Sequence, residues 1–367
     1  MHYIKAFIFS VYKFLIQFAY LFPYSKPWKK KKQDVIIWNP DSFECVDAEI
    51  TRVFNNKQGI VTIISDDGEF NTGKALKRLS DQYNLPITVA GTVRNVAKHL
   101  SFWKKAQKDH LFECVNHSYN HIRMDEASPI AKNRKCLMHE IIHSGKYFER
   151  VLKRPSISFV CPENKMCKKG YEIIQKSELY ATTKARKVFE YNSLNPDSGI
   201  QPGNWFNLER IGILDTSDEE ERKKWIDAAA KQGKWLIEIW HNVSENTSSG
   251  FQTISPETAE KHLQNLSEKK DEVWIALFTD AVKYIYERQD ATVKAFIQNE
   301  SIHIIVELNE LPKGIFDQDL SVKIDCSSEE FDKYTMDWVF EKENRYLLVN
   351  VTPGNVTPGI EKIVFLH

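Results

Sequence analysis

Residues 59–65 read GIVTIIS, an apolar run that ends directly on the polar triplet Asp66-Asp67-Gly68. A short apolar run of this kind, rich in β-branched residues, is typical of a β-strand. The triplet therefore places two adjacent carboxylates just past the predicted end of a strand. The fold and the role of these carboxylates depend on which strands lie beside this one.

Strands alternate with helices through most of the chain. Seven similar apolar runs occur at residues 34–38, 85–91, 111–115, 156–161, 179–183, 234–240 and 272–278. Segments with helical periodicity lie between most of them, at 73–83, 132–153, 218–232 and 255–269. Such alternation predicts an α/β fold with a parallel sheet and helices outside it. Seven or eight units favour a closed or nearly closed (β/α) barrel.

Beyond Arg288 the pattern changes. Residues 301–309, 320–326, 345–351 and 362–367 alternate or run apolar, with no helical segment between them. This pattern predicts a small antiparallel β module of sandwich type, and it places the boundary with the barrel near Asp290. We therefore divide the chain into an N-terminal segment (1–33), a barrel (34–290) and a C-terminal β module (291–367).

The N-terminal segment is apolar, aromatic and basic. Apolar side chains recur at helical spacing from Ile4 to Leu21 and would form one face of a helix. Lys5 and Lys13 would lie towards the opposite face of that helix. These lysines leave no uncharged run of the ~18 residues that a spanning helix needs. The pattern favours an amphipathic helix on a membrane surface, reinforced by the KPWKKKK run that follows. An uncleaved signal anchor and a helix packed on the protein's own core are the alternatives.

Charge and cysteine content narrow the class of protein. The 367 residues include 50 Lys and Arg and 50 Asp and Glu, so the overall charge gives no indication of nucleic-acid binding. Six cysteines are too few for a disulfide scaffold. Cys161 and Cys167 are close enough in sequence to form a bridge, but unpaired thiols are the interpretation that we favour.

Polar segments follow four of the predicted strands. They contain Asp66 and Asp67 after 59–65, His117 and His121 after 111–115, Pro162 with Glu163 and Asn164 after 156–161, and His241 after 234–240. The carboxyl ends of the strands of an α/β barrel share one rim, and active sites form there. Two histidines and adjacent carboxylates on one rim predict a divalent-metal site, because a catalytic zinc takes three protein ligands. His117, His121 and one aspartate would provide them.

A second metal-binding pattern competes with this one. Residues 139–143 read HEIIH, which matches the H-E-x-x-H pattern of zinc metalloproteases. The apolar stripe of the surrounding helix is formed by Leu137, Ile141, Phe148 and Leu152. His139 and His143 fall on the other, solvent-facing side of that helix. A protease site would also need a third ligand, and no metzincin-type continuation of the motif follows. We therefore do not expect a protease site here.

The polar clusters resemble the motifs of the polysaccharide deacetylases, the NodB-like domain of carbohydrate esterase family four. The sequence SDDG at residues 65–68 is similar to the first motif of that family, T-F-D-D-G. His117, Ser118 and His121 match the second motif, H-[ST]-x-x-H, and Ile239 with His241 matches the fifth, L-x-H, with one conservative change. The resemblance covers roughly residues 34–288 and implies a distorted seven-stranded barrel.

The resemblance also implies a function. It indicates a metal-dependent hydrolase, most simply with Zn²⁺, that removes N-acetyl groups from a glycan in the bacterial cell envelope. By this resemblance Asp67, His117 and His121 would bind the metal, Asp66 would be the general base and His241 the general acid. Pro162 and Ile239 would contact the substrate. These residue types suit the chemistry, since a bound metal lowers the pKa of water to about 7 and a free carboxylate can accept a proton. The protein would then be membrane-associated or extracytoplasmic.

Two motifs of the family are missing. The third, R-x-P-Y, has an Arg that orients the base, but the matching stretch FVCPENK keeps only Pro162. The fourth, an Asp-Trp pattern, is not clear in residues 195–206. Arg186 could replace the lost positive charge, although an ordinary surface arginine is the simpler interpretation. A catalytically silent glycan-binding barrel and an O-acetyl esterase therefore stay open as alternatives, and the intact Asp66 and His241 favour an enzyme.

Overall fold

The computed structural model describes residues 44–185, 192–193, 205–248, 250–298, 301–312, 314–326, 339–341, 344–353 and 360–365. The predicted N-terminal helix, the strand predicted at 34–38 and Arg186 lie outside the described residues. Within the described part of the chain, no helix is both long enough and apolar enough to cross a membrane.

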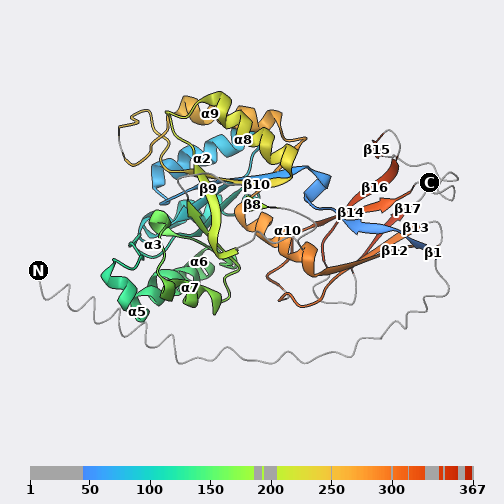
Figure 1. Ribbon diagram of the computed structural model, residues 1–367, viewed down its shortest axis with the longest axis horizontal. Coiled ribbons are helices and arrows are strands. Elements are labelled where there is room, and N and C mark those ends of the chain that lie inside the picture. Colours follow the sequence, from blue (N-terminus) through green and yellow to red (C-terminus); the bar gives the residue numbers. More distant parts are fainter. Residues whose placement is uncertain are drawn as a thin grey trace, which may run out of the picture. The chain divides into compact units, whose positions relative to one another are not determined.

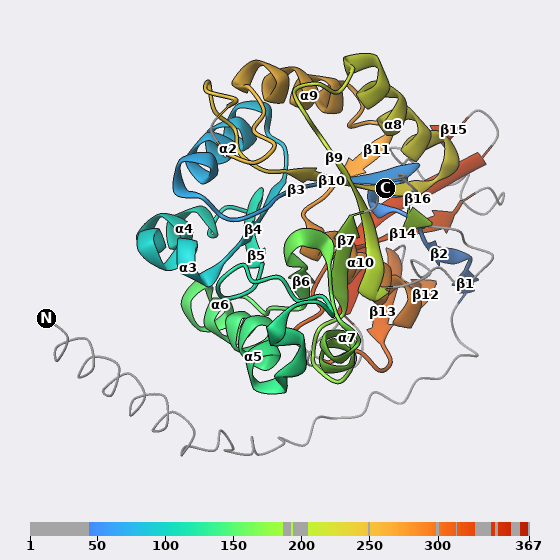
Figure 2. The same cartoon turned by 60° about the vertical axis from the view of Figure 1, so that its left-hand side comes forward.

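Seven parallel strands form a closed barrel (Figure 2). In spatial order they are β3 (Gly59–Ser65), β4 (Ile87–Gly91), β5 (Phe112–Asn116), β6 (Ser158–Val160), β7 (Ala181–Ala185), β9 (Leu208–Gly212) and β10 (Lys234–Trp240). The ring closes because β10 also pairs in parallel with β3, from Trp235 opposite Ile60 to Trp240 opposite Ser65. The predicted α/β barrel is thus confirmed. β9, however, is a strand that the sequence analysis did not predict.

The barrel is distorted beside β3. This strand pairs with β4 only through Ile64 and Ser65. Its first residues, Gly59 to Val61, pair instead with β11 (Val273–Ile275). The run predicted as a strand at 272–278 is therefore a strand only as far as Ile275, and helix α10 (Phe278–Asp290) follows it. The N–H of Phe278 donates to the Thr88 hydroxyl of β4 at 2.9 Å, which ties the start of α10 to the barrel wall.

Helices surround the barrel (Figures 1 and 2). They are α2 (Phe70–Tyr83), α3 (Val93–Val96), α4 (Leu100–Ala106), α5 (Arg134–Met138), α6 (Ser144–Leu152), α7 (Lys168–Gln175), α8 (Glu219–Gln232) and α9 (Pro256–Glu268). Four of them, α3, α5, α8 and α9, begin at capping side chains. In α8, for example, Asp218 accepts the Glu220 N–H at 3.2 Å, and in α9 Ser255 accepts the Thr258 N–H at 3.2 Å. A short β8 (Asn192–Ser193) pairs antiparallel with β10.

The strands are apolar on both faces, as expected for a parallel sheet between two cores. Alternate residues such as Ile64 and Ile237 fill the barrel interior together with Phe278 of α10. The intervening residues, such as Ile63 and Leu236, pack under the outer helices. This packing fixes the carboxyl ends of the strands, where the predicted site residues stand.

The C-terminal part is a sandwich of two antiparallel four-stranded sheets. One has the order β1 (Glu44–Val46), β12 (Ala291–Gln298), β13 (Ser301–Leu308), β17 (Ile360–Phe365). The other has the order β15 (Val339–Glu341), β16 (Asn344–Val351), β14 (Leu320–Asp325), β2 (Ala48–Ile50). Side chains from both sheets form one apolar core. The sandwich-like prediction is confirmed, but strands β1 and β2 come from residues that the sequence analysis had placed with the barrel.

Helix α10 contributes to two cores. Phe278, Val282 and Ile285 belong to the barrel interior, whereas Tyr284 belongs to the core of the sandwich. The Tyr284 hydroxyl also donates to the backbone carbonyl of Thr51 at 2.8 Å. The same helix therefore stabilises the barrel and the β module.

Candidate metal and catalytic site

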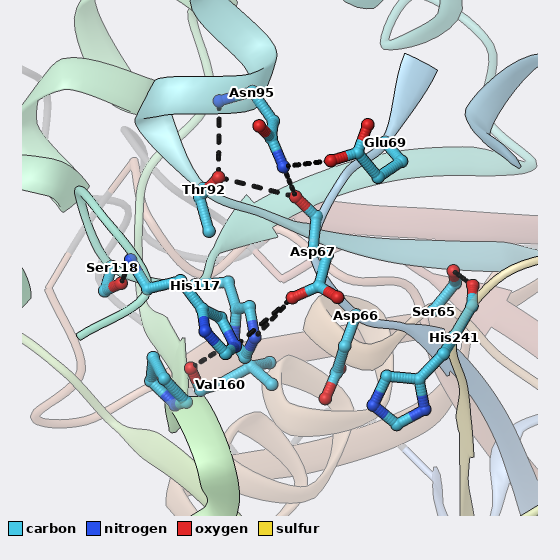
Figure 3. A network of polar contacts seen from close by, with 12 residues as sticks. Ser65, Asp66, Asp67, Glu69, Thr92, Asn95, His117, Ser118, Val160 and His241 are labelled. Atoms are coloured by element: carbon cyan, nitrogen blue, oxygen red, sulfur yellow. Dashed lines mark hydrogen bonds and ion pairs between the residues drawn. The ribbon is translucent and has the colours of Figure 1, made fainter. Parts of the chain in front are cut away.

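Three of the predicted residues converge at one rim of the barrel. Asp67 follows β3 and His117 follows β5 (Figure 3). His121 lies further along the loop that begins at His117. The Oδ1 of Asp67 is 3.2 Å from Nε2 of His121 and 3.7 Å from Nε2 of His117. A ligand atom from each of the three residues lies within 4.8 Å of the others. This is the donor set that the sequence analysis predicted for a divalent metal.

The environment of His117 fits a metal ligand. Its side chain is 1% exposed, and its Nδ1 lies 2.7 Å from the carbonyl oxygen of Val160. A carbonyl can only accept, so Nδ1 carries the proton and Nε2 presents a lone pair. That Nε2 is buried with no hydrogen-bond partner among the described residues, on the side where Asp67 and His121 stand. Burial lowers the pKa of His117, although the charges of Asp66 and Asp67 oppose this, which favours the neutral, ligating form.

The ligand-bearing loops have an unusual backbone. Asp67, Ser118 and His121 have φ angles of 75°, 75° and 58°, in the left-handed region that non-glycine residues rarely adopt. Gly68, with φ of 66°, continues the turn after Asp67, and a Cβ there would lie 2.7 Å from the Cα of Gly91. This close approach explains the glycine of the SDDG motif.

Local hydrogen bonds hold these strained positions. The backbone carbonyl of Asp67 accepts from the Asn95 side chain at 3.0 Å and from the Thr92 hydroxyl at 3.4 Å (Figure 3). The hydroxyl of Ser118 accepts the N–H of His121 at 2.9 Å. Backbone strain that is held by its surroundings is common at functional sites.

Asp66 has a different partner from Asp67. Arg210 of β9 donates to it from both ends of the guanidinium group, Nη1 to Oδ1 at 2.8 Å and Nη2 to Oδ2 at 3.0 Å. The side chains of Asp66 and Arg210 are 6% and 0% exposed. Burial alone would raise the pKa of Asp66. The charge of Arg210 and its hydrogen bonds outweigh burial and lower the pKa to about 2.

Arg210 is a candidate site residue that the sequence analysis missed. The missing positive charge was expected in the stretch around Pro162 or at Arg186. Period-two alternation could have revealed Arg210, because Leu208 and Arg210 share one face of β9 and both are buried. Pro162 opens a turn after β6, and Asn164 in that turn accepts from Nη2 of Arg210 at 2.9 Å. The Pro162 turn therefore reaches the same rim, through Arg210.

The remaining predicted residues lie on or after β10. His241 follows the strand directly, and its backbone carbonyl accepts from the Ser65 hydroxyl at 2.9 Å (Figure 3). Burial lowers the pKa of His241, although the charges of Asp66 and Asp67 oppose the shift. Among the described residues, no carboxylate is hydrogen-bonded to its ring. Ile239 is 5% exposed, two residues before His241.

The ring of Phe251 lies beside His241. The two ring centroids are 4.9 Å apart and the planes meet at 85°. Phe251 is 67% exposed, unlike the other large hydrophobic residues that the structure describes. An exposed aromatic ring next to a polar rim can contact a ligand, because its apolar face is already accessible.

The competing HEIIH pattern does not form a metal site. His139 is partly buried and His143 is exposed, and their ring centroids are 5.9 Å apart with perpendicular planes. Leu137, Ile141 and Phe148 are buried, as the predicted apolar stripe requires. The described residues bring no third donor to this pair, since the one cluster found among them is Asp67, His117 and His121.

Cys161 and Cys167 are free thiols, as the sequence analysis favoured. Both are buried, and burial raises the pKa of Cys161 to about 12. The thiol of Cys161 is therefore inert under ordinary conditions, because only the thiolate is reactive.

Comparison with known proteins gives structural neighbours only. No family model matches the sequence, and no curated protein matches it. A protein from Mycobacterium smegmatis described as a polysaccharide deacetylase is similar over 66% of this chain and 95% of its own, with 12% identity and a TM-score of 0.47. A CE4 family pseudoenzyme from Bacillus anthracis is similar over 62% of this chain and 66% of its own, with 13% identity and a TM-score of 0.40.

A third neighbour is the family 4 acetyl xylan esterase from Clostridium thermocellum, solved with a cobalt ion. It is similar over 61% of this chain and 91% of its own, with 13% identity and a TM-score of 0.40. Two of these three neighbours, the pseudoenzyme and the esterase, are described as members of carbohydrate esterase family four.

Proposed function

We propose that this protein is a metal-dependent hydrolase that removes N-acetyl groups from a glycan. One observation carries the proposal. The two adjacent carboxylates after β3 have different partners, since Asp67 faces two histidines whereas Asp66 is paired with Arg210. Hydrolysis of an amide by this type of site needs both a metal-binding carboxylate and a carboxylate that stays free of the metal.

Asp67, His117 and His121 would hold the metal, and their nitrogen and oxygen donors fit Zn²⁺. When bound, a divalent cation would polarise the acetyl carbonyl and acidify a nearby water molecule. The guanidinium group of Arg210 is hydrogen-bonded to both carboxylate oxygens of Asp66. These bonds keep the carboxylate from turning to join Asp67 as a ligand. Because its pKa is about 2, Asp66 is ionised at every physiological pH and can accept the proton of the attacking water.

His241, which follows the strand next to the one that ends just before Asp66, would donate a proton to the leaving amine. The pairing of Ser65 with Trp240 brings β3 and β10 together at the rim, so that Asp66 and His241 follow neighbouring strand ends. An amine is a poor leaving group unless it is protonated, and imidazole is the usual donor. Ile239 and the Pro162 turn would line the acetyl-binding side of the site.

The test is release of acetate by the purified full-length chain. We expect acetate from a panel of N-acetylated glycans, loss of release after treatment with a chelator, and recovery on addition of Zn²⁺ or Co²⁺. An O-acetylated glycan belongs in the same panel, because the site could also attack an ester. Release from esters alone would assign an O-acetyl esterase. Absence of release from every substrate, with metal bound, would contradict the hydrolase assignment.

Phe251 provides a prediction about substrate binding. Its exposed ring beside His241 suits stacking on the apolar face of a sugar ring. We expect Phe251→Ala to raise KM for a glycan oligomer about tenfold, whereas Phe251→Trp keeps KM near the wild-type value. Hydrolysis of a small acetyl ester without a sugar serves as the reference substrate. If KM for the glycan is the same in Phe251→Ala and wild type, Phe251 does not contact the sugar.

A second candidate function is a catalytically silent barrel that binds glycan. The observation in its favour concerns His241, whose ring has no carboxylate partner among the described residues. Burial lowers the pKa of His241 as well, so the protonated form that an acid catalyst needs is scarce at neutral pH. Glycan binding without acetate release would support this candidate.

The location of the protein is part of the proposal. The amphipathic pattern of residues 1–33 supports attachment to a membrane surface, where an envelope glycan would be within reach of the barrel. Removal of residues 1–33 would then release the protein from membranes in a fractionation experiment without changing its activity on a soluble glycan.

A further inference from the structure

The HEIIH segment has a feature that the proposed mechanism does not use. Residues His139–His143 form one turn of π-helix between α5 and α6. Glu140 in this turn points into the protein and is 2% exposed. Carboxylates are rarely buried without partners, and π-helical turns are frequent at functional sites.

The partners of Glu140 are in the loop that bears His117 and His121. Its Oε2 accepts the backbone N–H of Tyr119 at 3.1 Å and that of Asn120 at 2.8 Å. Its Oε1 accepts from the Asn120 side-chain amide at 2.8 Å. The charge is thus compensated by three N–H groups, all from the two residues that precede His121.

The same helical turn contacts the loop at two further points. The Asn116 side chain donates to the carbonyl of Ile141 at 2.9 Å and accepts the N–H of Ser118 at 3.0 Å. The ring of Tyr119 lies over the ring of His139, with centroids 4.3 Å apart. The turn therefore contacts Asn116, the last residue of β5, and the two residues before His121, Tyr119 and Asn120.

This loop needs external support. Ser118 and His121 have left-handed φ angles, which persist only where surrounding contacts hold them. The side chain of His121 is 37% exposed, so packing alone does not fix it. The position of the His121 side chain therefore depends on the loop backbone, which Glu140 holds through the N–H groups of Tyr119 and Asn120.

We infer that Glu140 is a positioning residue for the candidate metal site, which fixes the loop so that His117 and His121 face Asp67. The inference rests on the proposed function, since it assumes that these three residues bind metal. Glu140 does not touch the metal itself, and its effect is transmitted through the backbone of Tyr119 and Asn120.

The experiment measures metal affinity in the full-length chain, with Co²⁺ and Zn²⁺ as probes. Glu140→Leu removes all three acceptor contacts at similar volume. We expect the Kd of both ions to rise by about 10- to 100-fold, the usual range when a residue that orients metal ligands is lost. The visible spectrum of bound Co²⁺ should change as well, because it reports the ligand geometry. Glu140→Gln should restore most of the affinity, since its carbonyl can accept both backbone N–H groups after the Asn120 amide turns over.

Glu149 offers a matched control. It lies on α6 and also accepts a backbone N–H, that of Ser156 at 3.1 Å, but in a different loop. Glu149→Leu should leave the Kd of both ions and the Co²⁺ spectrum unchanged.

The possible outcomes are distinct. Wild-type affinity and spectrum in Glu140→Leu would overturn the inference while leaving the proposed metal site intact. Failure of the wild-type chain to bind either ion would overturn the metal site and the inference together. If Glu140→Leu does not fold, Asn120→Ala replaces it, because it removes only the side-chain contact. A smaller rise in Kd would then support the inference, and an unchanged Kd would overturn it.

Discussion

Asp66→Asn is expected to keep its bound metal and to release acetate about 10²- to 10⁴-fold more slowly, the usual cost of losing a general base. The amide keeps the size of the carboxylate but cannot take up a proton at neutral pH. Asp67→Asn is expected to weaken metal binding instead, because a neutral amide is a poorer ligand for a divalent cation. Metal content by mass spectrometry and acetate release, measured on the same preparations, separate the two effects.

The reverse result would be equally informative. Loss of metal from Asp66→Asn with full loading of Asp67→Asn would exchange the two roles. Full metal content and full activity in both variants would exclude the hydrolase mechanism and favour the silent glycan-binding barrel.

Arg210→Met is expected to have the largest effect on stability. The variant leaves the Asp66 carboxylate buried without its partner, and breaking a buried pair in this way typically costs about 3–5 kcal/mol. The free energy of unfolding of the metal-free chain can be measured with urea. The double variant Asp66→Asn, Arg210→Met should recover part of the loss, because no charge then remains buried unpaired.

The pH dependence of the free energy of unfolding should show whether the Asp66–Arg210 ion pair stabilises the fold. In the wild type the pKa of Asp66 is about 2 when folded, against an ordinary value of 3.8. Its ion pair therefore stabilises the fold above pH 4, and this contribution is lost as the pH falls towards 2. In Arg210→Met burial remains without the compensating charge, so the folded pKa should rise and stability should instead fall as the pH increases above 4. Equal pH dependence in wild type and Arg210→Met would contradict the role of this pair.

Much of the fold could be predicted from the sequence because the interior strands are continuous apolar runs. Residues 59–65 and 234–240 were predicted with the bounds that β3 and β10 have. β9 was missed because Leu208–Gly212 contains Glu209 and Arg210, and two charged residues in five conceal a buried strand. The missed strand also carries the missed residue. Arg210 is buried there with its charge neutralised by the Asp66 carboxylate.

The candidate metal ligands were predictable for a different reason. Asp67 and His117 lie within two residues of strand ends, and His121 lies four residues after His117 in the same loop. Their convergence therefore required only that the strands share one rim. Glu140 could not be assigned in this way. Its role depends on a π-helical turn that rotates its side chain inwards, and helical periodicity alone indicates no such turn.

The pairing of β1 with β12 and of β2 with β14 has a consequence for how the chain reaches its folded state. Each sheet of the sandwich combines a strand made before the barrel with strands made after it, so its contacts are of very high contact order. Closing so long a loop is entropically costly, and topologies of this kind fold slowly. During synthesis residues 44–50 would stay unpaired until their partner strands β12 and β14 have left the ribosome. We therefore expect the barrel to become protected from hydrogen exchange before β1 and β2 do.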